Sequence, residues 1–376
     1  MSVLAGQAAL LAGLDRRGRL RQLAPRVGVD FSSNDYLGLA ASGAMAEAAR
    51  AALDRGVPVG SGGSRLLRGN HPEHEALEQE AAAFFGSEAA LYFSTGFAAN
   101  SALFASVPQR GDMIFADALI HASVHEGLRL TKAGHRLVAH NDVAAFAAAI
   151  AEWRAEGGTG MPWIAVESLY SMDGDFAPLP ALMALAEAEG AVLVVDEAHA
   201  SGVFGPGGRG LVAQAGGRGN NVVTLHTCGK GLGAEGALLC GPAVLREFLV
   251  NRARGFIFST APSPLMAAVV RESLRISEAG NALRLGLQSR IALASEALRD
   301  LGATCHGSPI IPLVLRTDAR TMAVAGALQE KGFDVRGIRP PTVPEGSSRL
   351  RIVITNQVGK QDILELADHI REALRT

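Results

Sequence analysis

Short apolar runs alternate with segments of helical periodicity from residue 70 onward, and this alternation restricts the fold more than any other feature of the chain. The runs have the length of strands and are mainly apolar, as buried strands are. They cover residues 89–94, 111–117, 162–168, 191–197, 221–227 and 236–241. We therefore predict an α/β fold with a large, doubly wound, mainly parallel sheet between helices.

The segments between these runs carry helix signals. The predicted helices cover residues 71–86, 96–107, 121–134 and 178–190. Two of them end at Gly86 and Gly134, because glycine readily adopts the left-handed conformation that closes a helix. A further helix of amphipathic pattern is expected at the N-terminus.

The pattern changes after residue 270. A long helical stretch at 271–302 precedes an apolar run at 309–315, another helical segment and a second apolar run at 349–355. This order is typical of a smaller α+β unit. We predict three parts, which are an N-terminal segment 1–45, a large domain 46–270 and a small C-terminal domain 271–376.

Composition excludes several classes of protein. The net charge of -2 gives no basic excess for nucleic-acid binding, and we see no apolar run long enough to span a bilayer. Basic residues follow the first apolar stretch, which is the reverse of the order in a signal peptide. The three cysteines form no disulfide framework. We expect a cytoplasmic protein without nucleic-acid or membrane partners.

Three features fall where predicted strands end. Asp196 follows an apolar run, with His199 three residues later. Lys230 lies between glycines after the next run, and Gly96 separates a strand from a helix. Ligands of open α/β sheets bind at the carboxyl ends of the strands, so we expect these residues to meet at one edge.

Together these residue types match the needs of pyridoxal 5′-phosphate (PLP). This cofactor requires a lysine for its imine, a carboxylate for its pyridine nitrogen and an anion site for its phosphate. A helix N-terminus supplies free N–H groups for the last of these. Each feature alone is weak: an isolated lysine such as Lys230 is more often a surface residue. The prediction depends on their combination.

Other cofactors fit the sequence less well. The GKG segment at 229–231 lacks the hydroxyl residue and upstream glycine of a phosphate-binding P-loop, and GSGGSR at 60–65 lacks the dinucleotide-binding spacing. His121 and His125 have helical spacing but no HExxH order, so no metal is expected. An aromatic cofactor gives His121 a different role, which is to stack on the ring.

Motifs along nearly the whole chain carry a family resemblance. They are FSSNDYLGLA (31–40), GSGGSRLLRGN (60–70), STGFAAN (94–100), HAS (121–123), HND (140–142), ESLYSMDGD (167–175), DEAHASGVFGPGGRG (196–210), TCGKGLG (227–233), FSTAPSP (258–264) and RPPTVPEGSSRLR (339–351). With them the chain resembles the α-oxoamine synthases, which are fold-type-I PLP transferases. The RPPTVP segment favours the branch that serves biotin biosynthesis.

The resemblance implies a set of cofactor-binding residues. Lys230 would carry the cofactor as a Schiff base, Asp196 would pair with the pyridine nitrogen, and His121 would stack on the ring; these three are the expected catalytic residues. The remaining expected contacts are His199 and Ser171 at the ring hydroxyl, Gly96, Phe97 and Thr227 at the phosphate, and Ser259 and Thr260 at the phosphate of the other subunit. The last pair implies a homodimer with shared active sites.

The resemblance also implies a reaction and its substrate-binding residues. In it L-alanine condenses with a pimeloyl thioester of coenzyme A or acyl carrier protein, with loss of carbon dioxide. Asn34 and Arg351 would bind the amino-acid carboxylate, for which a planar guanidinium is well suited. His121, Arg21 and Thr342 would contact substrate, and Arg339 is a further candidate.

Two questions stay open at this point. Another α-oxoamine synthase, using glycine or serine with a different acyl-CoA, would share the same cofactor site. The sequence also departs from the family pattern at Cys228 and Glu235 and in a short stretch between Arg21 and Phe31. We expect Glu235 to face a helix and these departures to affect fine tuning more than the type of reaction.

Overall fold

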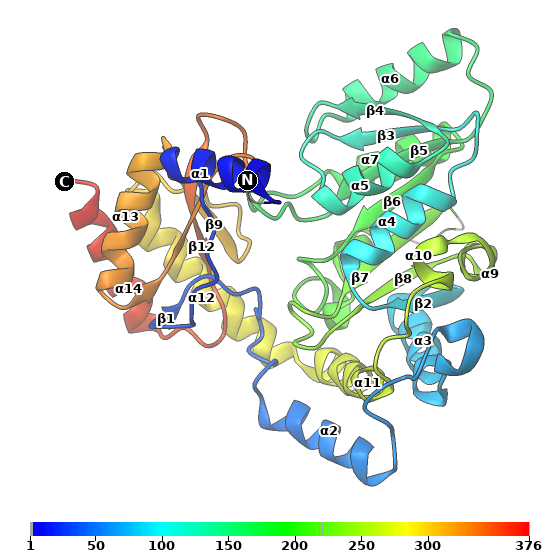
Figure 1. Ribbon diagram of the computed structural model, residues 1–376, viewed down its shortest axis with the longest axis horizontal. Helices are drawn as coiled ribbons and strands as arrows, with labels where there is room; N and C mark the ends of the chain where they lie inside the picture. Colours follow the sequence, from blue (N-terminus) through cyan, green and yellow to red (C-terminus); the bar gives the residue numbers. More distant parts are fainter. Residues whose placement is uncertain (1–2, 218, 220, 376) are drawn as a thin grey trace. The chain divides into compact units, whose positions relative to one another are not determined.

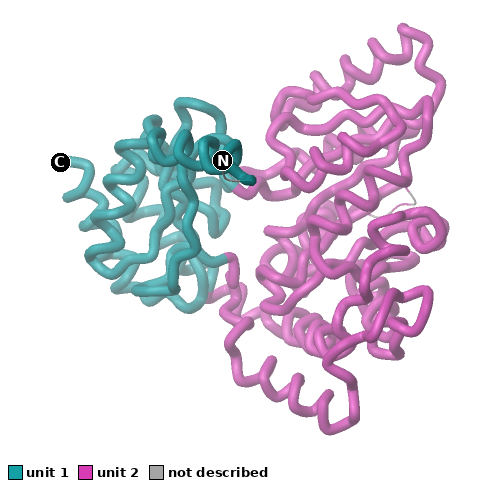
Figure 2. Tube along the Cα trace, in the orientation of Figure 1, with its two compact units in different colours: residues 1–33, 172–174, 287–376 teal, residues 34–171, 175–286 magenta. Residues whose placement is uncertain are grey.

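The computed structural model describes residues 3–217, 219 and 221–375, which form two compact units. Figure 2 shows the smaller unit in teal, made of residues 1–33, 172–174 and 287–376, and the larger in magenta, made of 34–171 and 175–286. The predicted segments 1–45, 46–270 and 271–376 have different bounds and stay a prediction about domains. The larger unit ends at Gly286 and the smaller unit resumes at Leu287, so this boundary falls within helix α12 (Asn281–Arg299).

A seven-stranded sheet is the centre of the larger unit (Figure 1). Its order is β2-β8-β7-β6-β5-β3-β4. The strands are β2 (Ala89–Phe93), β3 (Met113–Asp117), β4 (Gly134–Val138), β5 (Pro162–Glu167), β6 (Val192–Asp196), β7 (Val222–Thr227) and β8 (Ala237–Gly241). Strands β3 to β7 pair in parallel, and only β8 runs antiparallel to its neighbours β7 and β2. The predicted α/β class with a mainly parallel sheet is confirmed.

Helices cover both faces of this sheet, which is why its strands are apolar on both sides. One face packs against α4 (Gly96–Ser106), α5 (Ala122–Leu130), α9 (Ala243–Arg252) and α10 (Arg254–Ile257). The other packs against α6 (Val143–Ala155), α7 (Leu179–Ala188), α8 (Leu211–Gln214), α3 (Pro72–Phe85) and α11 (Pro264–Ala279). Helix α2 (Gly43–Asp54) packs on α11, and the short elements η1 (Arg65–Gly69) and η2 (Pro206–Gly208) complete the unit.

The smaller unit is built around a three-stranded antiparallel sheet. Its order is β11 (Arg336–Ile338), β12 (Ser348–Val353) and β9 (Ile310–Arg316), and helices α13 (Asp318–Glu330) and α14 (Lys360–Ala373) pack together in the same unit. A short parallel pair joins β1 (Val29–Asp30) to β10 (Phe333–Asp334). The N-terminal helix α1 (Ala5–Arg16) has no buried residue. The predicted α+β character of this region is confirmed.

The structure corrects three details. Helix α5 ends at Leu130, and Gly134, which we read as its stop, begins strand β4. Strand β4 was missed because it lies at the sheet edge and its residues are mostly exposed, so it has no apolar run. The stretch 271–302 is not one helix, because α11 and α12 meet at Gly280. Among the described residues, none of the helices is both long and apolar enough to cross a bilayer.

Candidate active site

Asp196 is the last residue of β6 and is only 7% exposed. Its Oδ2 atom accepts a hydrogen bond of 2.7 Å from Asn100 Nδ2, and its Oδ1 atom accepts one of 2.9 Å from the backbone N–H of Ala198. These two hydrogen bonds fix the orientation of the side chain. The strand end therefore presents a fixed carboxylate.

Glu167 lies directly beside Asp196, because the two are register partners in the parallel strands β5 and β6. Its side chain is buried, and its Oε1 atom has no hydrogen-bond partner among the described residues. Burial first, and the charge of Asp196 second, raise the pKa of Glu167 well above its usual range. Burial therefore disfavours the charged form of Glu167 beside Asp196.

His121 caps helix α5 and belongs to the same cluster. Its Nδ1 atom is 2.8 Å from Ser123 Oγ, which in turn accepts a bond of 2.9 Å from Asn100 Nδ2. Burial lowers the pKa of His121, the charge of Asp196 opposes this, and the charge of Lys230 lowers it further. The imidazole is therefore neutral at pH 7, with its flat ring beside the Asp196 carboxylate.

Lys230 lies in a tight turn after β7. The backbone N–H of Gly233 donates to the carbonyl of Lys230 at 2.8 Å, and that of Ala234 donates to Cys228 at 2.7 Å. Its positive charge lowers the pKa of both His121 and Glu167. The lysine is thus electrostatically within reach of the acids and the imidazole, as the strand-end argument predicted.

The N-terminus of α4 is where the anion site is predicted. Thr95 caps this helix with a 3.0 Å bond from the N–H of Ala98, and Gly96 is its first residue. A Cβ atom on Gly96 would come within 2.5 Å of Thr227 Cγ2, so only glycine fits against that side chain. Phe97, next along the helix, is 49% exposed. The first turn of α4 therefore lies against Thr227.

Tyr36 is a buried partner that the sequence did not reveal. Its hydroxyl lies 2.6 Å from His199 Nδ1 and donates to Asn34 Oδ1 at 3.2 Å. The tyrosine fixes the orientation of the His199 ring and places the predicted substrate residue Asn34 beside the predicted cofactor residue. No composition or spacing signal marked Tyr36 as anything but a core aromatic.

Ser171 follows β5, and its backbone N–H donates to Glu167. Ser259 and Thr260 lie exposed between α10 and α11, so their predicted contact with another subunit stays a prediction. Glu235 is exposed, and its carbonyl accepts from the Tyr92 hydroxyl at 2.7 Å; that its side chain faces a helix stays a prediction.

The remaining predicted substrate residues belong to the smaller unit. Arg21 Nη2 donates to Thr342 Oγ1 at 3.1 Å, so these two predicted contacts are neighbours. Arg339 donates to the carbonyl of Gly18, and Arg351 lies buried on β12. Asn34 and Arg351 fall in different units, and their joint binding of a carboxylate stays a prediction.

The residues of the larger unit fit PLP on their own chemistry. Each oxygen of the Asp196 carboxylate accepts one hydrogen bond from the protein, and a carboxylate oxygen can accept two. An N–H donor such as a protonated pyridine nitrogen can therefore be added. A lysine amine, a neutral flat imidazole and a helix N-terminus complete the set that this cofactor needs.

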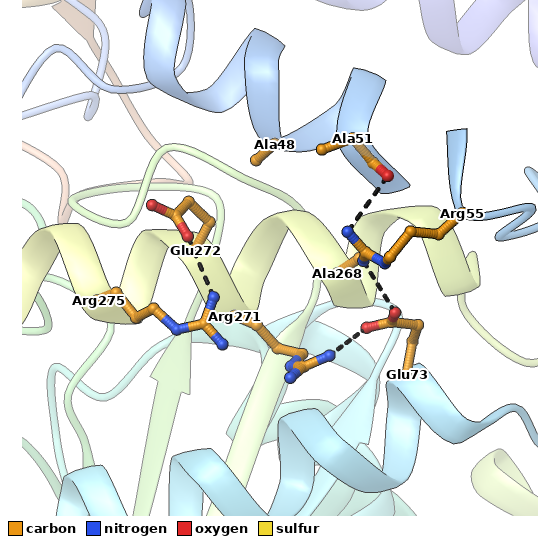
Figure 3. A pocket seen from close by; sticks show the side chains of 8 residues that line it. All are labelled: Ala48, Ala51, Arg55, Glu73, Ala268, Arg271, Glu272 and Arg275. Carbon is orange, nitrogen blue, oxygen red and sulfur yellow. Dashed lines mark hydrogen bonds and ion pairs between the residues drawn. The ribbon is translucent and has the colours of Figure 1, made fainter. Parts of the chain in front are cut away.

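A separate pocket of about 330 Å³ lies between α2, α3 and α11 (Figure 3). Arg55 Nη2 is 3.1 Å from Glu73 Oε1, and Arg271 Nη1 is 2.5 Å from Glu73 Oε2. Arg275 pairs with Glu272 on its own helix at 3.2 Å. Each arginine that lines this pocket is thus paired with a glutamate, and none of these residues is a predicted site residue.

Comparison with known proteins agrees with the fold. The family model for aminotransferase class I and II matches residues 26–370. The chain therefore belongs to the aminotransferase class I and II family. The predicted enzyme class, a transferase with this fold, is confirmed.

Named relatives narrow the resemblance within that family. The chain is 40% identical to 8-amino-7-oxononanoate synthase of Marinobacter nauticus, over 89% of this chain and 84% of that one. It is 42% identical to the same enzyme of Geobacter sulfurreducens, over 88% and 85%. The predicted resemblance to the α-oxoamine synthases, and within them to 8-amino-7-oxononanoate synthase, is confirmed.

Solved structures give the same result. A serine palmitoyltransferase from S. paucimobilis with a bound PLP–myriocin aldimine has a TM-score of 0.89 and 26% identity, covering 100% of this chain and 98% of that one. The 8-amino-7-oxononanoate synthase of Francisella tularensis has a TM-score of 0.78 and 26% identity, covering 93% and 98%. Both support a fold-type-I PLP transferase.

Proposed function

We propose that this chain catalyses the decarboxylative condensation of L-alanine with a pimeloyl thioester, the reaction of 8-amino-7-oxononanoate synthases in biotin biosynthesis. Its cofactor is PLP, and its acyl donor is pimeloyl-coenzyme A or pimeloyl-acyl carrier protein. The relatives at 40% and 42% identity support the reaction. The single observation that carries the cofactor assignment is the buried Asp196 carboxylate, fixed by Asn100, beside His121 and Lys230.

Each residue of the cluster has a distinct part in holding the cofactor. Lys230 would hold it as an imine through Nζ, Asp196 would accept from the pyridine nitrogen, and His121 would stack on the ring. When bound, the protonated ring supplies an electron sink for negative charge at the amino-acid Cα. His199 and Ser171 would contact the ring hydroxyl.

The phosphate side uses the first turn of α4. Gly96, Phe97 and Thr227 would surround the phosphate, where free backbone N–H groups and the helix dipole favour an anion. Ser259 and Thr260 would reach the phosphate of a second subunit. Such a contact requires a homodimer. We also propose that the protein is located in the cytoplasm.

Lys230 is also the base. Its Nζ, tethered in the turn after β7, would remove the proton from the alanine Cα. His121 is neutral, so it adds no positive charge that would disfavour transfer of the proton to the Lys230 amine. Asn34 and Arg351 would bind the alanine carboxylate until it leaves as carbon dioxide, while Arg21 and Thr342, which touch each other, would contact substrate.

The competing proposal is that this chain is another α-oxoamine synthase, which uses a different amino acid and acyl donor. The likeness to serine palmitoyltransferase, at a TM-score of 0.89, favours serine or glycine as the amino acid with a different acyl-CoA. The relatives named 8-amino-7-oxononanoate synthase favour alanine.

Product analysis tests the assignment. Purified protein with PLP is incubated with alanine, glycine or serine, each paired with acyl-CoA donors of several lengths, and thiol release and product mass are measured. We expect the highest kcat/KM for alanine with pimeloyl-CoA. A higher value for serine or glycine with a long-chain donor would contradict the assignment.

A further inference from the structure

His140 has no role in the site described above, yet two carboxylates hold its imidazole. Its Nδ1 atom is 2.8 Å from Asp117 Oδ1, and its Nε2 atom is 2.8 Å from Asp175 Oδ2. An imidazole can donate to two carboxylates at once only when both nitrogens carry protons. Burial alone would lower the pKa of His140, but the bonds to Asp117 and Asp175 overcome it and raise the pKa to about 10.

The three groups come from the ends of three neighbouring strands. Asp117 is the last residue of β3, His140 follows β4, and Asp175 lies in the hairpin after β5. Strand β3 pairs with both β4 and β5. The bridge therefore lies at the same carboxyl edge of the sheet as the proposed cofactor site.

Asp117 holds the turn that leads to His121. Its Oδ1 atom also accepts from the N–H of Leu119 at 2.8 Å, and its carbonyl accepts from the N–H of Ile120 at 3.1 Å. His121 is the next residue and caps α5. Asp117 is fully buried, so its position fixes where His121 begins the helix.

Asp175 holds the hairpin that carries Ser171. Its carbonyl accepts from the N–H of Tyr170 at 3.0 Å, and Leu169 forms an antiparallel bridge with Phe176. The His140 ring meets the Tyr170 ring edge-on, with centroids 4.4 Å apart. Ser171 is the next residue after Tyr170, so both contacts act on its position.

Asn141 reinforces the bridge from the same loop as His140. Its backbone N–H donates to Asp117 Oδ2 at 2.9 Å, and its Nδ2 atom donates to Asp175 Oδ2 at 2.9 Å. It does so in the left-handed region, with φ of 55°. Asparagine tolerates that conformation better than most residues, which suits it to bond both acids at once.

We propose that His140 is a positioning residue, and that the Asp117–His140–Asp175 bridge fixes the turn before His121 and the hairpin of Ser171 relative to each other. Both residues then reach the cofactor ring together. This rests on the proposed function, because it assumes that His121 and Ser171 contact PLP. The imidazolium acts through these loops and touches neither cofactor nor substrate.

The test compares His140→Gln with His135→Gln in the full-length protein. His135 is exposed on β4, five residues before His140, and serves as the matched control. We measure PLP affinity by fluorescence titration of the apoprotein, circular dichroism of the bound cofactor's visible band, and kcat and KM for L-alanine. His140→Gln should bind PLP about tenfold more weakly, as expected for loss of a charge-assisted hydrogen bond, and should change the dichroism. His135→Gln should match the wild type.

Asp175→Asn provides a second variant in case His140→Gln does not fold. It keeps the shape of the side chain and removes one charge, and it should change affinity and dichroism in the same direction. In the double variant the two effects should not add, because both break the same bridge.

The outcomes separate the two proposals. One possible result is that the wild type binds PLP and that His140→Gln and Asp175→Asn both keep its PLP affinity and dichroism. This result would overturn the positioning role alone, even if the unfolding temperature of the variants falls. A wild-type protein that binds no PLP would overturn the proposed function and, with it, this inference.

Discussion

Asn100 Nδ2 donates a hydrogen bond of 2.7 Å to Asp196 Oδ2, and both side chains are buried. Asn100 lies in the second turn of α4, the helix whose first residue is Gly96. One helix thus fixes the Asp196 carboxylate and, in the proposed function, would also present its N-terminus to the PLP phosphate. Asn100 and Asp196 are 96 residues apart in the chain, and only the fold joins them.

Replacing Asn100 with alanine should impair the cofactor site without changing any group that would touch PLP. Without this hydrogen bond the Asp196 carboxylate loses the contact that fixes its orientation, so its pairing with a protonated ring nitrogen should weaken. We expect turnover to fall by about 10- to 100-fold, the usual effect of losing a bond to a charged group. Ser106→Ala is the control, because it removes a side-chain hydrogen bond to the Ala102 carbonyl in the same helix and leaves the bond to Asp196. An equal loss in both variants would contradict the special role of that bond.

Gly96→Ala should weaken PLP binding because the added Cβ would meet Thr227 Cγ2 at 2.5 Å. Thr227 would have to move, and the phosphate contacts with it. Gly43→Ala is a close control: Gly43 is also the first residue of a helix behind a capping hydroxyl, and a Cβ there meets no atom within 4 Å. We expect at least about tenfold weaker PLP binding for Gly96→Ala alone, measured by fluorescence titration. Equal affinities in the two variants would show that the phosphate lies elsewhere.

His121→Phe keeps a flat ring but loses the Nδ1 acceptor that caps α5. If His121 stacks on PLP and also contacts substrate, acyl transfer should fall more than PLP affinity, because stacking survives and the polar contact does not. The measurement is kcat for condensation beside the Kd for PLP. A larger defect in PLP retention than in acyl transfer would contradict this role.

Stability should depend on pH through His140. Its pKa is raised from 6.5 to about 10 in the folded protein, so the bridge contributes its full stabilisation below pH 6.5 and loses it as the pH rises toward 10. The unfolding temperature of His140→Gln should therefore lie furthest below the wild type at pH 6.5 and approach it near pH 10. Asp117, Asp175 and Tyr170 face the ring and stay unchanged in this comparison. A difference that grows with pH would contradict the charged bridge.

The sequence predicted the parts of the site that follow apolar strands. Asp196 and Lys230 stand out because each ends or follows a buried run, and parallel strands bring such ends to one edge. Asn100 and Tyr36 were missed because a polar residue inside a helix and an aromatic residue in a loop have no local pattern that indicates a partner. In the sequence, His140 had a place in a family motif but no role. Its two acidic partners become its neighbours only through strand pairing.

The errors in the fold have the same origin. Gly134 was taken as a helix stop because glycine often ends helices, but here it starts an edge strand whose mostly exposed residues give no apolar run. The stretch 271–302 was read as one helix because helical periodicity continues across Gly280, and only tertiary structure places the break there.

The most direct test of the central claim is the absorbance spectrum of purified protein supplied with PLP, for the wild type and Lys230→Ala, before and after L-alanine. The wild type should show the visible band of cofactor held as an imine, which shifts with alanine and changes again when pimeloyl-CoA is added. Lys230→Ala should lack that band before alanine is added and should give no turnover, although PLP can still bind non-covalently. A Lys230→Ala protein that keeps the band and normal turnover would contradict the assignment of Lys230.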